Sequence, residues 1–499
     1  MATIELLIAF TILILNISAA ALVINGGQSI QTDSALYTEA TALAESMLED
    51  AKVVAKQDFR YLRSSVVTEG AFEKRLEVRE TGLFTKAVES VVSFQSGGRS
   101  GYASFSTVLN NLDAIDGGDT CSSTLEGNWN TPSITSYDFA EDILGNPAGI
   151  FPITSILAFD GRLYVTVNNQ SLNNAPSFFI LSTDRDEVPE VIGTLDNNLS
   201  VSGGLNSVAI DGKNYAYVAN GHEANFSACA EGPSCAQLQV IDIRNPLNPQ
   251  IVRNYKIPGV GGNPGQAIGK TIIYQNGVVY LGLSRATGTE FNIIDVGGGG
   301  TEGATPINPI WLSGFETDSN GINNIFIRGG YAYIASSKDE ELEILDISDF
   351  SNPIEVGEFN APGGGANNGN GKSLALLGDS LYLGRTLLSG DEFYILDNSH
   401  PDSTLSVRDS ANIQNLPNNT SVNGIVVRDH LVFLLTNGTL KIWDISNPEE
   451  IREYTDPIIL PPGEGNSQQG TAIDCEGNYI FTGSQNFQFR GFISIISGS

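Results

Sequence analysis

Histidine, methionine, tryptophan and cysteine are all scarce in this chain of 499 residues, which contains three, two, three and four of them. The histidines lie far apart and no Cys-x-x-Cys pair occurs, so neither residue type forms a zinc-binding pattern. Basic residues are also few, because 26 Lys and Arg stand against 57 Asp and Glu, a formal net charge of −31. This excess argues against nucleic acid or an anionic membrane surface as a partner, since both require basic patches. It favours a soluble, exported protein that stays dispersed when crowded.

The motifs of familiar catalytic and phosphate-binding sites are missing as well. The chain has no Gly-x-Ser-x-Gly elbow, no phosphate-binding loop and no His-Glu-x-x-His sequence. Acidic residues are common, but no pair stands out as a general acid and base. The sequence therefore predicts no catalytic residues, no metal site, no cofactor and no enzymatic activity.

The four cysteines form an even set, which in an exported protein indicates disulfides. Cys229 and Cys235 flank Gly232-Pro233 within one loop, and we expect them to pair. Elimination leaves Cys121 and Cys475, whose bond would join a connector to the last repeat of the chain. Closing so long a loop would restrict the unfolded chain by about 4 kcal/mol or more in the chain-entropy account.

The first 24 residues are almost entirely apolar, with one acid, Glu5, near their start. A run of this length is typical of a transmembrane-type helix. No Lys or Arg occurs before Lys52, so the basic flank of an ordinary signal peptide or anchor helix is missing. From Gln28 to about Lys56 apolar residues recur at helical spacing, which predicts one long helix over residues 1–57 with a weak point at Gly26-Gly27.

The opening Met1-Ala2-Thr3-Ile4-Glu5-Leu6-Leu7 resembles the start of mature type IV pilins. This resemblance covers about the first 60 residues. It implies that a basic leader has been removed by a prepilin peptidase, that Met1 is methylated, and that the helix waits in the inner membrane before assembly. It also implies that Glu5 pairs with the terminal amine of a neighbouring subunit. An ordinary signal peptide or anchor helix is the alternative.

Residues 58–132 have a different character. The segments 76–79 and 88–94 alternate apolar and polar residues like half-buried strands. They resemble the small β layer that packs on the helix of a pilin head. Residues 96–134 are rich in Gly, Ser, Asn and Asp, and we interpret them as a connector that contains Cys121 and Trp129.

Residues 133–499 repeat with a period near 50 residues. Each copy is built around an apolar run, clearest at 238–243, 342–347 and 440–445 and weaker at 178–181, 291–295, 393–397 and 492–496. Two short strands precede each copy and another follows most copies, which is the content of a propeller blade. The unit resembles the LVIVD-type repeat, and seven copies imply a seven-bladed β-propeller.

Two details of the repeat lead to further expectations. Asp242, Asp346 and Asp444 follow the apolar run, and we expect each to end its strand by binding its own turn backbone, with a metal role as the alternative. The last copy ends in its third strand, so a fourth must come from elsewhere. Residues 133–140 have the right pattern, and their pairing with residues 492–496 would hide two sheet edges.

The loops between blades are long and rich in Gly and Asn, at 259–264, 363–371, 417–423 and 462–470. In a propeller they share a face with loops inside the blades, such as 220–237, and that face usually holds ligands. The composition fits turns that need positive φ, or a neutral polar surface for a glycan or a protein receptor.

Together these patterns predict an α+β multidomain chain: a long N-terminal pilin-type helix with a small β layer, then an all-β seven-bladed propeller. The predicted function is a structural subunit of an extracellular type IV pilus-like filament. Its helix would form the core of a homopolymer, delivered by the inner-membrane assembly machinery, and its propeller would serve adhesion or protection outside. The alternatives are a minor pilin or pseudopilin with a ligand-binding tip, or a surface-tethered propeller enzyme.

Overall fold

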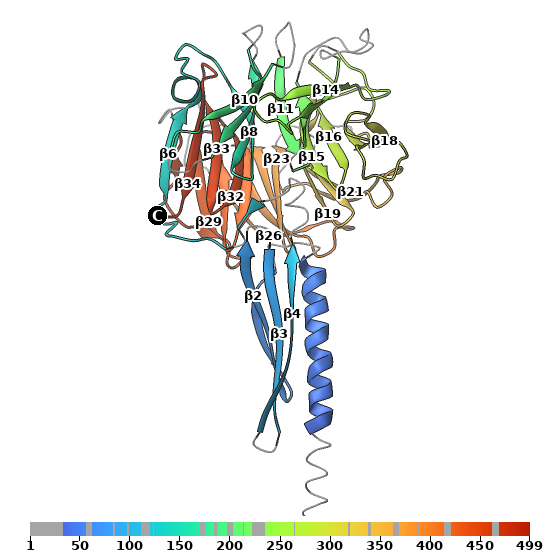
Figure 1. The fold of residues 1–499 in the computed structure, drawn as a ribbon. Coiled ribbons are helices and arrows are strands. Elements are labelled where there is room, and N and C mark those ends of the chain that lie inside the picture. Colours follow the sequence, from blue (N-terminus) through green and yellow to red (C-terminus); the bar gives the residue numbers. More distant parts are fainter. Residues whose placement is uncertain are drawn as a thin grey trace, which may run out of the picture. The chain divides into compact units, whose positions relative to one another are not determined.

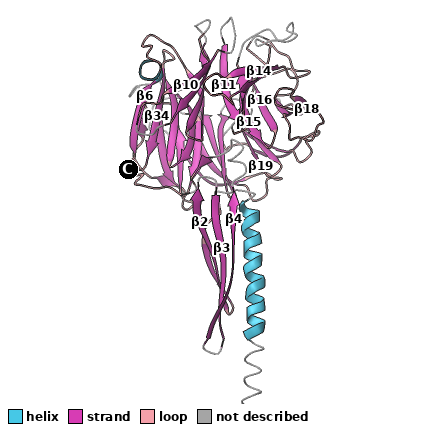
Figure 2. Cartoon of the chain, in the orientation of Figure 1, coloured by secondary structure: helices cyan, strands magenta, loops and turns pink. Residues whose placement is uncertain are grey.

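The chain divides into two compact units, Met1–Asn111 and Leu112–Ser499. Apart from one helix, strands make up most of the drawn secondary structure (Figure 2). The computed structural model describes residues 33–55, 62–82, 85–96, 99–110, 120–122, 124–169, 175–183, 187–196, 203–212, 214–221, 235–263, 265–317, 320–337, 341–362, 369–387, 390–413, 421–461 and 469–499. The predicted apolar segment 1–24, with Met1 and Glu5, lies outside these residues. Within them, no helix combines the length and hydrophobicity needed to cross a bilayer.

The N-terminal unit contains a helix over residues 33–55 and one antiparallel sheet (Figure 1). The strands follow one another in the order β1-β2-β3-β4, as a meander. Their bounds are β1 (Ser65–Glu69), β2 (Phe72–Gly82), β3 (Thr85–Ser96) and β4 (Arg99–Asn110). The described helix thus matches the amphipathic part of the predicted helix 1–57, and the sheet matches the predicted β layer.

Alternation in the strands places one apolar face of this sheet against the helix. Ala40 and Ala44 are fully buried on the helix and pack with Val92 of β3. These small alanines let the helix come close enough for the Ser90 hydroxyl to donate to the Ala44 carbonyl at 2.7 Å. The predicted alternation at 76–79 is present, because Leu76 joins the core while its neighbours face away.

The second unit contains seven four-stranded antiparallel blades in its described residues. The first three are β7 (Ile153–Phe159), β8 (Arg162–Asn169), β9 (Phe178–Ser182), β10 (Val191–Leu195); β11 (Gly203–Ile210), β12 (Tyr215–Asn220), β13 (Leu238–Asp242), β14 (Gln250–Tyr255); and β15 (Gly269–Gln275), β16 (Val278–Leu283), β17 (Phe291–Asp295), β18 (Ile310–Phe315). The next three are β19 (Ile322–Arg328), β20 (Tyr331–Ser336), β21 (Leu342–Asp346), β22 (Ile354–Phe359); β23 (Gly369–Leu377), β24 (Ser380–Leu387), β25 (Phe393–Asp397), β26 (Ser406–Ala411); and β27 (Gly424–Arg428), β28 (Leu431–Leu435), β29 (Thr439–Asp444), with β30 (Arg452–Glu453) and β31 (Ile458–Ile459).

The last blade is made from both ends of the unit. It comprises β32 (Gln469–Gly477), β33 (Tyr479–Gln485), β34 (Gly491–Ser497) and β6 (Ser133–Asp138). Strand β6 pairs antiparallel with β34 from Ser133↔Ser497 to Phe492↔Asp138. The predicted closing strand is therefore confirmed, with a π-helical turn, Phe139–Ile143, directly after it.

The first strands of the blades form a closed inner ring. Each contacts the first strand of the next blade, in the order β7, β11, β15, β19, β23, β27, β32 and back to β7. The blades pack face to face around this ring, so the third strand of a blade is buried on both sides. Val240 packs toward the third blade, whereas Ile241, next in sequence, packs toward the first. This two-sided burial explains why the repeat is a continuous apolar run rather than an alternating one.

The predicted connector 96–134 is wrong in its first part, because residues 99–110 form β4 of the N-terminal sheet. Its later part belongs to the propeller unit. The sequence placed residues 58–132 together, but the boundary between the units falls after Asn111. A short strand, β5 (Thr120–Cys121), pairs in parallel with β32. The predicted connector residue Trp129 is buried against Phe433 of the sixth blade, with ring centroids 5.0 Å apart.

Candidate functional site

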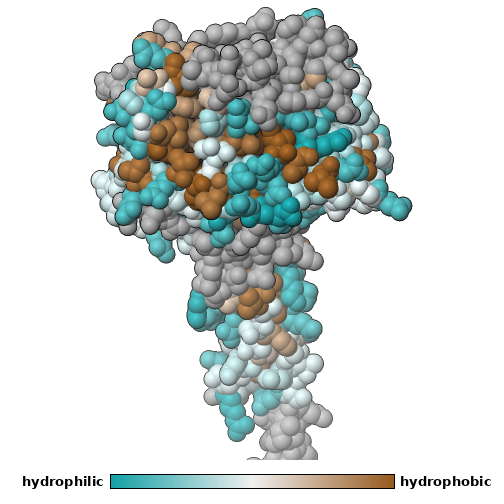
Figure 3. All heavy atoms as spheres, turned by 45° about the horizontal axis from the view of Figure 1, so that its top comes forward, coloured by the Kyte–Doolittle hydropathy of each residue, from teal (hydrophilic) through white to brown (hydrophobic). Residues whose placement is uncertain are grey.

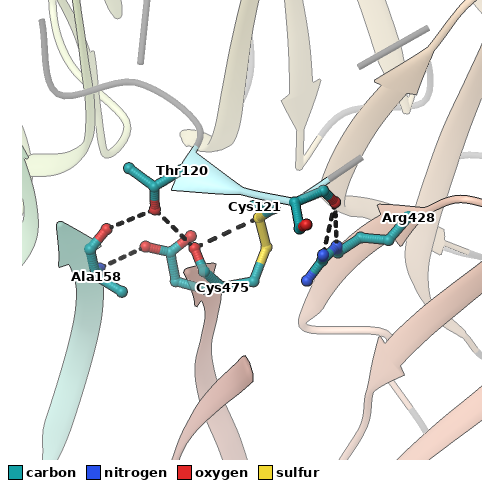
Figure 4. The surroundings of a disulfide bond; sticks show 7 residues. Thr120, Cys121, Ala158, Arg428 and Cys475 are labelled. Carbon is teal, nitrogen blue, oxygen red and sulfur yellow. Dashed lines mark hydrogen bonds between the residues drawn. A yellow bond between two sulfur atoms is a disulfide. The ribbon is translucent and has the colours of Figure 1, made fainter. Parts of the chain in front are cut away.

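The connector is held to the last blade by a disulfide between Cys121 and Cys475, the second of the two predicted pairs. Their Cα atoms lie 5.2 Å apart, across a sequence separation of 354 residues. Beside the bond, the Thr120 hydroxyl lies 3.1 Å from the Ala158 carbonyl and 2.9 Å from the Cys475 carbonyl (Figure 4). The buried Arg428 donates to the carbonyl of Ser122 on the other side. These contacts anchor the connector to the last blade and to the first and sixth blades on either side of it.

Of the remaining predicted site residues, Cys235 lies within the described part of the chain and the others do not. Cys235 is buried and is disulfide-bonded. Its predicted partner, Cys229, lies outside the described residues, and so do the assembly residues Met1 and Glu5.

The aspartates after the apolar runs bind their own turns, as the sequence predicts. In Asp346 and Asp444 one carboxylate oxygen accepts the backbone N–H two residues later, each at 2.9 Å, and Asp242 does the same with Arg244. Asp295, in a weaker repeat, accepts four backbone N–H groups from a glycine-rich loop. The bonds from Ser446 and Arg452 outweigh burial and lower the pKa of Asp444 to about 2.

A second acid position recurs just before the third strand, and sequence reasoning missed it. Glu290, Glu341 and Glu392 each accept a backbone N–H at the end of the fourth strand, and Gln237 does so in the second blade. In each of these repeats the Glu or Gln stands one position before the apolar run. Its recurrence at this position could have identified it from the sequence.

Glu341 also forms an ion pair with Arg385 of the next blade, and both side chains are at most 1% exposed. The guanidinium of Arg385 donates to the Asp391 carbonyl and lies 5.5 Å from the centre of the Tyr394 ring. With such complete burial, this pair is a structural link between two blades rather than a reactive site.

The main cavity of the propeller lies inside the ring of first strands and has a volume of about 1110 Å³. A β-bulge interrupts the first strand of six blades near its beginning, which leaves one residue of each strand unpaired. In the sixth blade Asn423 occupies the corresponding place, just before β27. All seven residues line the cavity: Thr154, Asn206, Lys270, Asn323, Lys372, Asn423 and Thr471.

Hydrogen bonds from these ring residues tie neighbouring blades together. The side-chain amides of Asn206 and Asn423 donate to the carbonyls of Gly269 and Gly470 in the following blades, at 2.7 and 2.8 Å. Asn323 donates in the same way to Gly371, where a Cβ atom would lie 2.0 Å from the Glu341 carbonyl. Glycine is therefore required at this close approach.

Within the described part of the chain, the charged side chains of the cavity wall are cationic. Among the described residues that line it, the charged ones are Lys270 and Lys372, and none is Asp or Glu. The ammonium group of Lys270 donates to Asn323 Oδ1 at 2.5 Å, a neutral acceptor. Burial, helped by the nearby charge of Lys372, lowers the pKa of Lys270 to about 8. Burial also lowers the pKa of Lys372.

These ring residues were not singled out in the sequence, although a signal was present. Each repeat has a short motif with the polar ring residue two positions before an aliphatic one, as in Gly269-Lys270-Thr271-Ile272 and Gly371-Lys372-Ser373-Leu374. The predicted inter-blade loops run into these motifs, and Asn423 and Gly470 at their ends line the cavity. The predicted ligand face was expected to be neutral, but the described wall of the cavity contains Lys270 and Lys372. Within the described residues no group of three potential ligands could hold a metal ion.

A closed ring of four-stranded blades around an inner cavity defines the second unit as a β-propeller. A family model described as the LVIVD repeat matches residues 322–361, which contain β19 to β22 and so form the fourth blade. No curated protein matches the chain.

Several solved structures are similar to the chain at low identity. One is the extracellular domain of a hybrid two-component system from B. thetaiotaomicron, at 9% identity and a TM-score of 0.46; the match covers 89% of this chain and 57% of that one. A protein assigned as a 6-phosphogluconolactonase from Bacteroides uniformis matches at 12% identity and a TM-score of 0.45, over 75% of this chain and 92% of that one. A hypothetical selenium-binding protein from Sulfolobus tokodaii matches at 9% identity and a TM-score of 0.41, over 69% and 84%. Such distant likenesses carry no argument about function.

Proposed function

We propose that the chain is a structural subunit of an extracellular pilus-like filament, in which the N-terminal helix polymerises and the propeller is displayed outside. The observation that carries this proposal is the helix over residues 33–55 packed along a four-stranded antiparallel sheet, directly after an apolar run of pilin-like sequence. One face of the helix is covered by the sheet. Tyr37 and Val53 on this helix are 55% and 54% exposed, so each offers an apolar side chain to a neighbouring subunit.

The propeller has properties that suit display outside the cell. The Cys121–Cys475 bond favours an oxidising location. Strand β6 covers the edge of β34, which removes a template for unwanted strand pairing. Hydrophobic and hydrophilic residues are interspersed on the propeller surface in view (Figure 3), and the net charge of −31 opposes aggregation between crowded subunits.

Electron microscopy of the full chain, co-expressed with a prepilin peptidase and an assembly machinery, tests the proposal. Filaments with globular heads repeated along their length are the expected result. Heads confined to one end of a fibre made by another protein would instead indicate a minor, tip-located subunit. A chain that is secreted or membrane-anchored but never polymerises would overturn the proposal.

A further inference from the structure

We propose that the central cavity of the propeller binds a small polyhydroxylated anion, a sugar acid or a sugar phosphate, through the ammonium groups of Lys270 and Lys372. This inference concerns the propeller alone and stands whether or not the chain forms filaments.

The charge of the cavity favours an anionic ligand. Acids outnumber bases by more than two to one in the chain, yet among the described residues of the cavity wall the charged side chains are two lysines. Among the described residues, no hydrogen bond or ion pair is made by Lys372, and the hydrogen bond of Lys270 goes to the neutral amide of Asn323. Half-buried ammonium groups without a counter-charge are costly, because desolvation and mutual repulsion both disfavour the charged form. An anion between them removes both penalties.

The cavity is larger than an inorganic ion needs, and its wall carries neutral polar groups as well as the lysines. Its volume of about 1110 Å³ suits a ligand of sugar size or larger. Amide and hydroxyl groups surround the lysines, among them Asn324, Thr386 and Ser421. They offer donors and acceptors in the mixed arrangement that a set of sugar hydroxyls needs.

An aromatic side chain also lines the cavity. Phe489 lines the cavity, is 54% exposed, and has a φ of 60°, which a bulky residue rarely adopts. Its loop is fixed from within, because Asn486 Oδ1 accepts the N–H groups of Gln488 and Arg490 and the Phe489 N–H donates to the Asn486 carbonyl. Backbone strain that holds an apolar ring in water beside a polar cavity is typical of a ligand contact. The ring offers apolar surface to the C–H face of a sugar.

Calorimetric titration of the full chain in detergent tests the proposal with four probes: glucuronate, glucose 6-phosphate, inorganic phosphate and glucose. We expect both sugar anions to bind, phosphate to bind more weakly, and glucose not to bind. Preference between glucuronate and glucose 6-phosphate distinguishes a sugar acid from a sugar phosphate. Binding of neither, or equal binding of glucose, would overturn the proposal. Phosphate bound as tightly as both sugars would reduce the site to a simple anion site and overturn its sugar part.

Variants separate the roles of the residues. Lys270→Gln and Lys372→Gln should each weaken sugar-anion binding about tenfold or more. Lys256→Gln, the matched control, makes the same change of charge at a lysine that is not part of the cavity wall and should leave binding unchanged. Phe489→Ala should weaken binding of both sugars but not of phosphate. Equal losses in Lys256→Gln would show that only net charge matters.

Two further readouts exclude a merely structural role for the lysines. Without ligand, Lys372→Gln should melt at the same or a higher temperature, because it removes an unpaired, desolvated charge. With glucuronate at a fixed concentration, the unaltered chain and Lys256→Gln should gain more stability than Lys372→Gln. Binding should take up protons near pH 8 and weaken above it, since the anion favours the charged form of Lys270, whose pKa is lowered to about 8 in its absence. A Lys372→Gln variant that melts far lower, with binding independent of pH, would contradict the proposal.

Discussion

Cys121 and Cys475 are separated by 354 residues in the sequence, yet the disulfide between them holds their Cα atoms 5.2 Å apart. Cys121 belongs to β5 and Cys475 to β32, so the bond reinforces a parallel strand pair that joins the connector to the final blade. The same blade receives β6 at its other edge. Entry and exit of the propeller chain are therefore fixed at one place, by one covalent bond and two strand pairings.

Replacing both Cys121 and Cys475 by Ser should destabilise the propeller without unfolding it, because β6 still closes the ring. In the chain-entropy account a loop of this length contributes about 6 kcal/mol. Guanidinium unfolding of the double variant, compared with the unaltered chain with and without reductant, measures the effect. Reductant should lower the unfolding free energy of the double variant only slightly. A large additional loss would show that the disulfide of Cys235 contributes more to stability than the Cys121–Cys475 bond.

Replacing residues 133–138 by a Gly/Ser segment of equal length should lower the melting temperature and cause association. The change removes β6 and exposes the edge of β34, an apolar strand. Size-exclusion chromatography and calorimetry report both effects. The same replacement of β1, a fully exposed edge strand of the N-terminal unit, is the control. A monomeric product with unchanged melting would show that β6 is not needed for closure.

Arg385→Met should cost about 3–5 kcal/mol, because it leaves the carboxylate of Glu341 buried without a partner. The double variant Arg385→Met/Glu341→Gln should recover much of this loss, since glutamine keeps an acceptor for the Ala361 N–H. A double-mutant cycle in urea isolates the coupling between the two blades. Additive losses would mean that the two side chains act independently.

Asp444→Asn should make the propeller less sensitive to acid. Because the folded-state pKa of Asp444 is about 2, below the ordinary Asp value, its ionisation stabilises the fold fully above about pH 5. That contribution, about 2 kcal/mol, is lost as pH falls toward 2. Melting curves between pH 6 and pH 2 should therefore converge for the two proteins. Exposed Asp402, changed to Asn, serves as the control, and a similar convergence there would contradict this assignment to Asp444.

Glu5→Ala should leave the chain in the membrane as monomers. The prediction comes from the sequence: a single acid within an apolar run is costly unless a neighbouring subunit's terminal amine pairs with it. Membrane fractionation and electron microscopy of surface material test it. Glu39→Ala, on the exposed surface of the helix over residues 33–55, is a matched control that should still assemble. Fibres of normal number and form from Glu5→Ala would disprove the role.

The sequence predicted those features that recur locally. The apolar runs at 238–243 and 342–347 mark third strands because burial on both faces excludes polar residues there. The turn-binding aspartates follow from local chemistry, since each bond spans two residues. The last repeat lacks a fourth strand, and this was enough to predict β6. A blade with three strands leaves one edge unpaired, and one segment with a strand pattern can pair with it.

The features that the sequence did not reveal depend on the ring as a whole. Lys270 and Lys372 come from the third and fifth blades and converge only because their strands share one axis. The residue at the bulge position is Thr, Asn or Lys in different blades, so the repeats do not share one residue type there. Glu341 and Arg385 likewise meet across two blades. The segment 99–110 was assigned to the connector because its many Ser residues hide the strand β4. The rest of the connector was grouped with the N-terminal unit because a two-residue strand such as β5 leaves no periodicity.

Closure of the last blade by both ends of the unit makes the starting point of the propeller arbitrary. The backbone of Ser499 already exchanges hydrogen bonds with that of Asn128, at 2.8 and 3.1 Å. A short linker could therefore join the two ends of the propeller, and new termini could be cut between other blades without removing a strand from any sheet. Such a circular permutant would keep its core and its cavity. A propeller of this kind can therefore be joined to another domain at any of several blades.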